Sequence, residues 1–232
     1  HRVRSRSIKP GDYRGRCATI PAMSAAPRRL LLPAAGLTRE GARTVVEALG
    51  AGAIIIYPTD TLYAVGCGAR HAAALARLRA AKGREAGKAF PVIAADEDDA
   101  RRLASRWPEA AARLAEVFWP GPLTLIVPAA NDLPVDLLAG SPGVAVRVPA
   151  SSVARALAAG AGPLVSTSAN LAGEPPCVST DAALAAFPSA ELAVDVGPLD
   201  GAPSTIVDVT GEQVRIVREG RVAASEVWAA LK

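Results

Sequence analysis

Apolar residues follow two spacings along this 232-residue chain, and the two alternate from about residue 38 onward. Short runs rich in Val, Ile and Leu, bounded by Pro or Gly, are typical of buried strands. Longer stretches rich in Ala, Leu and Arg have the spacing of helices with one buried face. The pattern predicts helices at about 39–49, 71–81, 97–105, 109–118, 151–159, 180–186 and 224–231, and strands at 53–57, 90–95, 123–127, 144–148, 164–168, 192–196, 205–209 and 214–218.

Capping and turn residues set the limits of these elements. Thr38, Ser151 and Thr180 have the hydroxyl side chains that are preferred at helix N-termini. Strands that alternate with helices predict a layered α/β domain, and Thr210-Gly211 between the last two strands predicts a hairpin, so the sheet is expected to be mixed. Segments rich in Pro, Gly and polar residues predict loops at 59–70, 128–143 and 171–179.

Polar side chains follow the first predicted strand directly. Thr59, Asp60 and Thr61 come after Pro58, where the apolar run ends. In open α/β sheets ligands bind beyond the carboxyl ends of the strands, and small hydroxyls there can contact a polar ligand without filling its pocket. The alternative is a capped turn, because Asp and Thr commonly bond to neighbouring backbone.

A basic cluster follows one helix later, at Lys82, Arg84 and Lys88. Lys and Arg bind phosphate oxygens, so the cluster indicates a site for a phosphorylated ligand; the alternative is a solvated basic surface. The sequence GREAGKA is not a phosphate-binding P-loop, because its glycines are too close together and Ala89 follows the lysine.

Two later segments add candidate binding residues. Ser166, Ser168 and Asn170 alternate at the end of a predicted strand, so their side chains share one face; they suit nucleotide recognition or a polar strand terminus. Arg147 lies within the apolar strand Val-Ala-Val-Arg-Val and needs an anionic partner if it is buried. A ligand carboxylate or an internal Asp would serve equally well.

Composition narrows the possible functions. The two histidines and three widely spaced cysteines exclude most histidine-dependent metal sites and a disulfide framework, and they fit a reducing compartment. No apolar run approaches the roughly 20 residues of a membrane span. The net charge of +4 is concentrated in residues 1–22, which hold six basic residues and one acid, leaving −1 for residues 23–232. The charge therefore does not indicate a nucleic-acid-binding domain.

The basic N-terminal segment lacks the apolar region of a secretory signal. We expect residues 1–30 to be a basic, disordered leader and residues 31–232 to form one domain. A transit peptide is the alternative, because the segment contains Arg and Ser and has few acids.

Six short motifs occur together in one order, and through them the chain resembles the YrdC-like family, the threonylcarbamoyl-adenylate synthases. The resemblance extends from about residue 38 to the end. The motifs are PTDTLYxxG at 58–66, KGR at 82–84 with the following Lys88, WPGPLT at 119–124, VRVP at 146–149, STSAN at 166–170 and STIVD at 204–208.

The resemblance implies a fold and a reaction. Family members have a twisted mixed α/β sheet with flanking helices and a large concave basic cavity, and the chain matches the short, single-domain type. They are ATP-dependent nucleotidyltransferases that make L-threonylcarbamoyl-AMP from L-threonine, bicarbonate and ATP, with Mg²⁺, and release pyrophosphate. A separate transferase complex then modifies the adenosine beside the anticodon of ANN-decoding tRNAs. The resemblance also implies a cytoplasmic enzyme, or an organellar one if the leader is a transit peptide.

Motif by motif, the resemblance also implies site roles. Thr61, Arg147 and Ser204 would bind the substrate threonine, and Arg147 would hold the carboxylate of that threonine. Lys82 and Arg84 would be catalytic. Residues implied to bind ATP are Lys82, Arg84, Lys88, Ser166, Ser168, Asn170 and Arg218. No metal-ligating residues are implied, since Mg²⁺ would be held by phosphates and water.

Three departures from the family pattern stand out. Ala64-Val65 replaces the commoner Gly-Leu, and Ala89 stands where Pro usually follows the lysine. Ile93 occupies a position where many relatives have a histidine that meets threonine. The last departure bears on one substrate contact but not on the class of reaction.

Two other functions compete with the synthase. One is a module that binds double-stranded RNA or tRNA, against which the net charge of −1 outside the leader argues. The other is the carbamoyl-adenylate-forming domain of hydrogenase-maturation proteins, which belongs to longer chains with zinc-finger-like cysteines.

Overall fold

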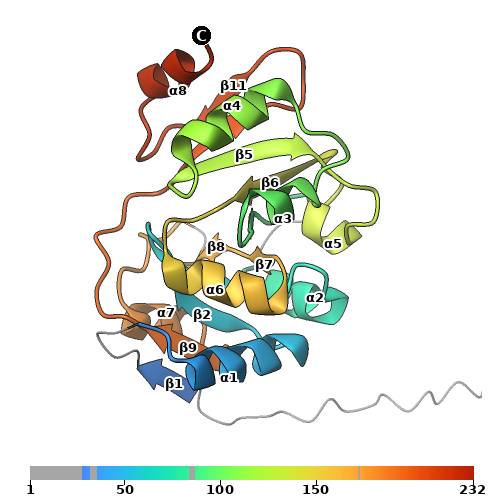
Figure 1. Ribbon diagram of the computed structural model, residues 1–232. Helices are drawn as coiled ribbons and strands as arrows, with labels where there is room; N and C mark the ends of the chain where they lie inside the picture. Colours follow the sequence, from blue (N-terminus) through green and yellow to red (C-terminus); the bar gives the residue numbers. More distant parts are fainter. Residues whose placement is uncertain (1–27, 32–35, 84–86, 172) are drawn as a thin grey trace, which may run out of the picture.

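The computed structural model describes residues 28–31, 36–83, 87–171 and 173–232, and these form two mixed β-sheets (Figure 1). The α/β class and the mixed strand pairing are confirmed. The sequence predicted a single sheet, whereas the strands form two separate sheets. The first has the strand order β1 (Arg28–Leu31), β9 (Leu192–Asp195), β2 (Ile55–Pro58), β3 (Tyr63–Gly66) and β8 (Thr167–Ser168). The second has the order β11 (Arg215–Arg218), β10 (Thr205–Asp208), β5 (Leu123–Pro128), β6 (Gly143–Arg147), β4 (Val92–Ile93) and β7 (Leu164–Val165).

Helices cover the outer faces of these sheets (Figure 1). Helix α6 packs against β2 of the first sheet and β4 of the second, whereas α4 and α8 pack on each other beside β5. The helices are α1 (Arg39–Gly50), α2 (Ala72–Ala81), α3 (Glu97–Arg101), α4 (Glu109–Phe118), α5 (Val135–Leu138), α6 (Ser152–Ala161), α7 (Thr180–Ala186) and α8 (Ala224–Ala230).

Side-chain caps begin several helices where the sequence predicts them. The hydroxyls of Thr38 and Ser151 each accept a hydrogen bond from the backbone N–H three residues on, at 3.1 and 3.2 Å. His71 caps α2 in the same way through Nδ1, so it has a structural role. The cap of α7 is Ser179, one residue before the predicted Thr180, because the extended backbone at Ser179 lets its hydroxyl reach the first turn.

The predicted loop 59–70 contains a strand. Residues Tyr63–Gly66 form β3, which pairs antiparallel with β2 after a tight turn at 59–62. Gly66 favours a loop in the sequence, but here it allows close backbone approach: a Cβ at this position would overlap the carbonyl oxygen of Val165 in β7. The glycine therefore marks the place where the first sheet touches the second.

We expect Gly66→Ala to lower the free energy of unfolding by about 3 kcal/mol, because the added methyl forces β3 and β7 apart. Urea denaturation measures the change. Gly50→Ala is the matched control, since a Cβ on Gly50 at the end of α1 meets nothing within 4 Å. A Gly66→Ala protein as stable as the control would contradict this packing.

The predicted strand 164–168 divides between the two sheets. Residues Leu164–Val165 pair with β4, whereas Thr167–Ser168 pair with β3. Ser166 lies at the division, where its backbone N–H donates to the carbonyl of Pro91 at 2.8 Å. The chain crosses from one sheet to the other here, and so it brings the polar residues of STSAN between them.

Three further segments differ from the sequence prediction. Arg28–Leu31 lie in β1, parallel to β9, so residues 28–30 of the predicted leader belong to a sheet; residues 1–27 lie outside the described part of the chain. The segment 128–143 includes the short helix α5, because Pro134 starts a turn there and Leu137 is buried. Helix α3 ends at Arg101, four residues before the predicted end.

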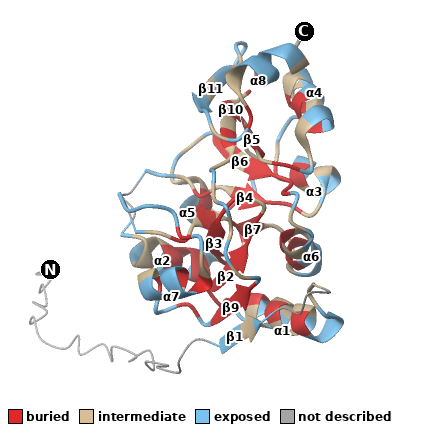
Figure 2. Cartoon of the chain, turned by 90° about the vertical axis from the view of Figure 1, so that its left-hand side faces the viewer, coloured by how far each residue is buried: buried red, intermediate tan, exposed pale blue. Residues whose placement is uncertain are grey.

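The buried residues lie mainly on the strands and on the inward faces of the helices (Figure 2). Cys67 and Cys177 are free and buried, and burial raises the pKa of the Cys67 thiol to about 12. Cys67 therefore stays protonated and unreactive at neutral pH. None of the helices in the described ranges has the length and apolar character needed to cross a membrane.

Candidate functional site

A cavity of about 530 Å³ lies between the two sheets. Strands β3 and β8 of the first sheet and β4, β5, β6, β10 and β11 of the second contribute to its wall. Seven of the ten predicted site residues line it: Thr61, Arg147, Ser166, Ser168, Asn170, Ser204 and Arg218. The two arginines agree with a basic lining, although the predicted large, concave basic cavity stays a prediction because Arg84 lies outside the described residues.

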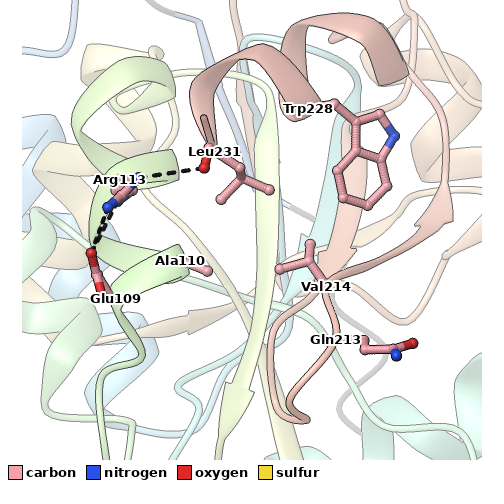
Figure 3. Close-up of a pocket in the computed structure, with 7 residues that line it drawn as sticks. All are labelled: Glu109, Ala110, Arg113, Gln213, Val214, Trp228 and Leu231. Carbon is pink, nitrogen blue, oxygen red and sulfur yellow. Dashed lines mark hydrogen bonds and ion pairs between the residues drawn. The ribbon is translucent and has the colours of Figure 1, made fainter.

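A second hollow, of about 580 Å³, lies between α4, α8 and the loop before β11 (Figure 3). None of the predicted site residues lines it. Its two charged residues already bond each other, since Arg113 Nη2 lies 2.6 Å from Glu109 Oε1. The cavity between the sheets is therefore the better candidate site.

The turn at 59–62 places one group of polar side chains in the cavity. The backbone N–H of Thr59 donates to the carbonyl of Leu62 at 3.1 Å and closes the turn. Thr61 Oγ1 then lies 3.4 Å from Nη2 of Arg147, and Asp60 Oδ1 lies 3.2 Å from its Nη1. Both predicted alternatives apply here, because the turn is capped and its two threonines, Thr59 and Thr61, also line the cavity.

Arg147 has the anionic partner that its burial requires. Its exposed fraction is 6%, and desolvation lowers its pKa, although the nearby carboxylate of Asp60 opposes that shift. The internal Asp that the sequence allowed is therefore Asp60. Because Arg147 also lines the cavity, its guanidinium can bind a ligand carboxylate there as well.

A second polar group lies at the start of β10. Ser204 Oγ is 2.9 Å from Thr124 Oγ1, and Arg218 Nη2 donates to the carbonyl of Ser204 at 2.8 Å. Burial lowers the pKa of Arg218. Thr124 lines the cavity and was missed as a site residue, although the WPGPLT motif, which it ends, was the available signal.

A third group joins the STSAN segment to the basic cluster. Lys82 Nζ donates to the backbone carbonyls of Ser168 and Asn170, at 2.9 and 2.6 Å. The structure thus brings Lys82 to the STSAN segment, but Lys82 and Lys88 do not line the cavity. Arg84 lies outside the described residues, so the contact of the basic cluster with a ligand stays a prediction.

Asn170 shows an unfilled hydrogen-bonding capacity. Its Nδ2 donates to the carbonyl of Glu174 at 2.6 Å, whereas its buried Oδ1 has no partner among the described residues. A buried acceptor without a donor is unfavourable. A ligand donor in the cavity would satisfy it.

Ile93 provides an apolar wall next to Arg147. The two residues are partners in the parallel pairing of β4 and β6, and Ile93 is 1% exposed. Ile93 lines the cavity, so the departure from the family histidine falls within the site.

Comparison with known proteins agrees with this arrangement. Residues 47–220 match the sequence model of the Sua5/YciO/YrdC family, which is described as telomere recombination. A threonylcarbamoyl-AMP synthase of Thiobacillus denitrificans is 41% identical over 187 residues, which cover 77% of this chain and 97% of the relative.

Two solved structures share the fold. Sua5 of P. abyssi complexed with L-threonine has a TM-score of 0.83 and 28% identity, covering 89% of this chain and 61% of that one. The chain therefore spans about three-fifths of the P. abyssi protein. E. coli YciO has a TM-score of 0.79 and 26% identity, covering 87% of this chain and 99% of that one. The chain belongs to the Sua5/YciO/YrdC family.

Proposed function

We propose that this protein makes L-threonylcarbamoyl-AMP from L-threonine, bicarbonate and ATP and releases pyrophosphate. One observation carries the proposal: Thr61, Arg147 and Ser204, from three separate motifs, meet in one cavity. The relative from Thiobacillus denitrificans is named a threonylcarbamoyl-AMP synthase, and the P. abyssi relative binds L-threonine.

The cavity has the groups that an amino acid requires. Arg147 binds the threonine carboxylate with the fork of its guanidinium, while Asp60 keeps the buried cation neutralised between turnovers. Thr61 and Ser204 supply hydroxyls for the polar groups of threonine. Their hydrogen bonds to Arg147 and Thr124 hold these hydroxyls in place before a substrate arrives.

The nucleotide binds beside the threonine. Ser166, Ser168 and Asn170 offer hydroxyl and amide groups along one side of the cavity, and Arg218 adds a cation from β11. Lys82, Arg84 and Lys88 bind the phosphates of ATP from the segment after α2.

The chemistry has two steps. The threonine amine adds to carbon dioxide derived from bicarbonate and loses a proton to water, which gives a carbamate. A carbamate oxygen then attacks the α-phosphorus of ATP, and the bond from this phosphorus to the bridging oxygen of pyrophosphate breaks. Negative charge develops on phosphate oxygens, so positioning and cationic stabilisation by Lys82 and Arg84 supply most of the catalysis.

Magnesium enters with ATP. The described residues hold no group of three or more His, Cys, Asp or Glu side chains that would form a metal site. Mg²⁺ commonly keeps several waters and binds substrate phosphates, which would offset their charge here.

The product serves the threonylcarbamoyl modification of the adenosine beside the anticodon of ANN-decoding tRNAs. A separate transferase complex carries out that transfer, and this protein supplies the adenylate in the cytoplasm. Direct RNA binding by this chain is not required for its own reaction.

The test is pyrophosphate release by the full chain with ATP, Mg²⁺ and bicarbonate, with and without L-threonine. We expect release that depends on threonine and is weak with serine. A folded, ATP-binding protein that releases none would overturn the proposal, and tRNA binding at several salt concentrations would then test the RNA-binding alternative.

A further inference from the structure

The hydroxyl of Thr59 is enclosed by protein groups at the edge of the cavity. Its Oγ1 lies 2.7 Å from the carbonyl oxygen of Leu62 and 2.9 Å from Oγ1 of Thr61. The backbone N–H groups of Thr61 and Leu62 both donate to it at 3.1 Å. Thr59 is only 4% exposed, so water hardly competes for these bonds.

The proton of Thr59 has one destination. A hydroxyl carries one proton, and a carbonyl oxygen can only accept a hydrogen bond. The short contact with the Leu62 carbonyl therefore uses the Thr59 proton. Because Thr59 has no second proton, the bond between the two hydroxyls is donated by Thr61, and the N–H groups of Thr61 and Leu62 share the other lone pair of the Thr59 oxygen.

The same count fixes what Thr61 offers to a ligand. Its proton points to Thr59, and Nη2 of Arg147 donates to its oxygen at 3.4 Å. One lone pair remains on the oxygen, and Thr61 lines the cavity. Thr61 can therefore accept a hydrogen bond from a ligand, but it has no proton left to donate.

We propose that Thr59 is a positioning residue that orients the Thr61 hydroxyl as a hydrogen-bond acceptor for the substrate. This inference rests on the proposed function, in which Thr61 binds L-threonine. The substrate group opposite Thr61 is then a donor, either the α-ammonium group or the β-hydroxyl. A substrate oxygen without a hydrogen is disfavoured at this position.

Thr59→Val tests the inference, because valine keeps the shape of threonine and removes the hydroxyl. We expect the KM for L-threonine to rise about tenfold, which corresponds to one lost or misdirected hydrogen bond, while the KM for ATP changes by less than about twofold. Thr59→Ser keeps the hydroxyl and should restore the wild-type KM. Thr59→Ala gives the same readout if the valine variant does not fold.

Two further comparisons separate positioning from a structural role. If Thr59 acts through Thr61, adding Thr59→Val to Thr61→Val should raise the KM for threonine by less than about twofold. L-2-Aminobutyrate, which lacks the β-hydroxyl, identifies the substrate group that donates to Thr61. If it inhibits Thr59→Val more weakly than the wild-type protein, the donor is the ammonium group. If it inhibits both equally, the donor is the β-hydroxyl.

Two results would overturn the inference. One is an unchanged KM for threonine in a folded Thr59→Val protein. The other is an equal increase in the KM values for threonine and ATP that the Thr59→Ser variant also shows. Calorimetric titration of L-threonine into the same variants measures the change in threonine affinity without turnover. Absence of threonine-dependent pyrophosphate release from the wild-type protein would instead overturn the proposed function.

Discussion

Arg147→Lys is expected to lower kcat/KM for L-threonine by at least about 100-fold, while the affinity for ATP stays within about twofold. Asp60 and Thr61 contact separate nitrogens of the Arg147 guanidinium, and a substrate carboxylate needs the same planar fork. A lysine ammonium has three N–H donors, but they radiate from a single nitrogen and cannot match separated partners as the planar fork does. A 100-fold loss corresponds to about 2.7 kcal/mol, which lies within the roughly 2–5 kcal/mol that impairing a buried, hydrogen-bonded charge pair costs.

Steady-state kinetics with threonine varied at saturating ATP, and calorimetric titration of ATP, measure the two effects. Arg43→Lys is the matched control, because Arg43 is exposed on α1 and pairs only loosely with Glu47, at 3.7 Å. We expect the control to have wild-type kinetics. A folded Arg147→Lys protein with wild-type kcat/KM for threonine would refute the assignment of the carboxylate site.

Local pattern was enough to predict most of the fold. The helices with side-chain caps and the longer strands β2, β5, β6 and β10 follow from apolar spacing and from Thr, Ser, Pro and Gly at their ends. Local pattern failed where pairing is decided by distant segments. Gly66 predicts a loop by its composition, yet it pairs with Ile55 of β2, and its missing Cβ lets the backbone of Val165, about a hundred residues later, approach closely.

The division of residues 164–168 between two sheets has the same cause. A five-residue polar-ended run cannot reveal that its first part pairs with β4 and its last part with β3. The chain passes from one sheet to the other there, and the cavity is lined by strands of both sheets. Its existence is a property of tertiary pairing and not of any local window.

The sequence indicated which residues belong to the candidate site better than it indicated how they contact one another. The chemistry of a buried arginine requires an anion, but only the fold shows that the anion is Asp60, 87 positions away in the sequence. The motifs grouped Thr61, Arg147 and Ser204 as threonine-binding residues; all three line one cavity, and their binding role stays a prediction. The roles of Thr124 and Thr59 depend on hydrogen bonds that no spacing in the sequence encodes.

Lys82→Ala is expected to lower kcat for pyrophosphate release by about 100- to 1000-fold, the loss typical of removing one electrostatic contact to a transition state. Lys82 follows α2, and its ammonium reaches the backbone of the STSAN segment, beside the proposed nucleotide site. Among the residues that the structure describes, Lys82 joins the basic cluster to that segment. Alanine favours the helical backbone of Lys82, so the fold should persist.

Three comparisons make the test decisive. Lys82→Arg keeps the charge and should retain more activity than Lys82→Ala, whereas Lys232→Ala removes an exposed lysine at the C-terminus and should have no effect. Near-ultraviolet circular dichroism checks that each variant keeps its tertiary packing. Wild-type activity in a correctly folded Lys82→Ala, Arg84→Ala double variant would refute the catalytic roles proposed for Lys82 and Arg84.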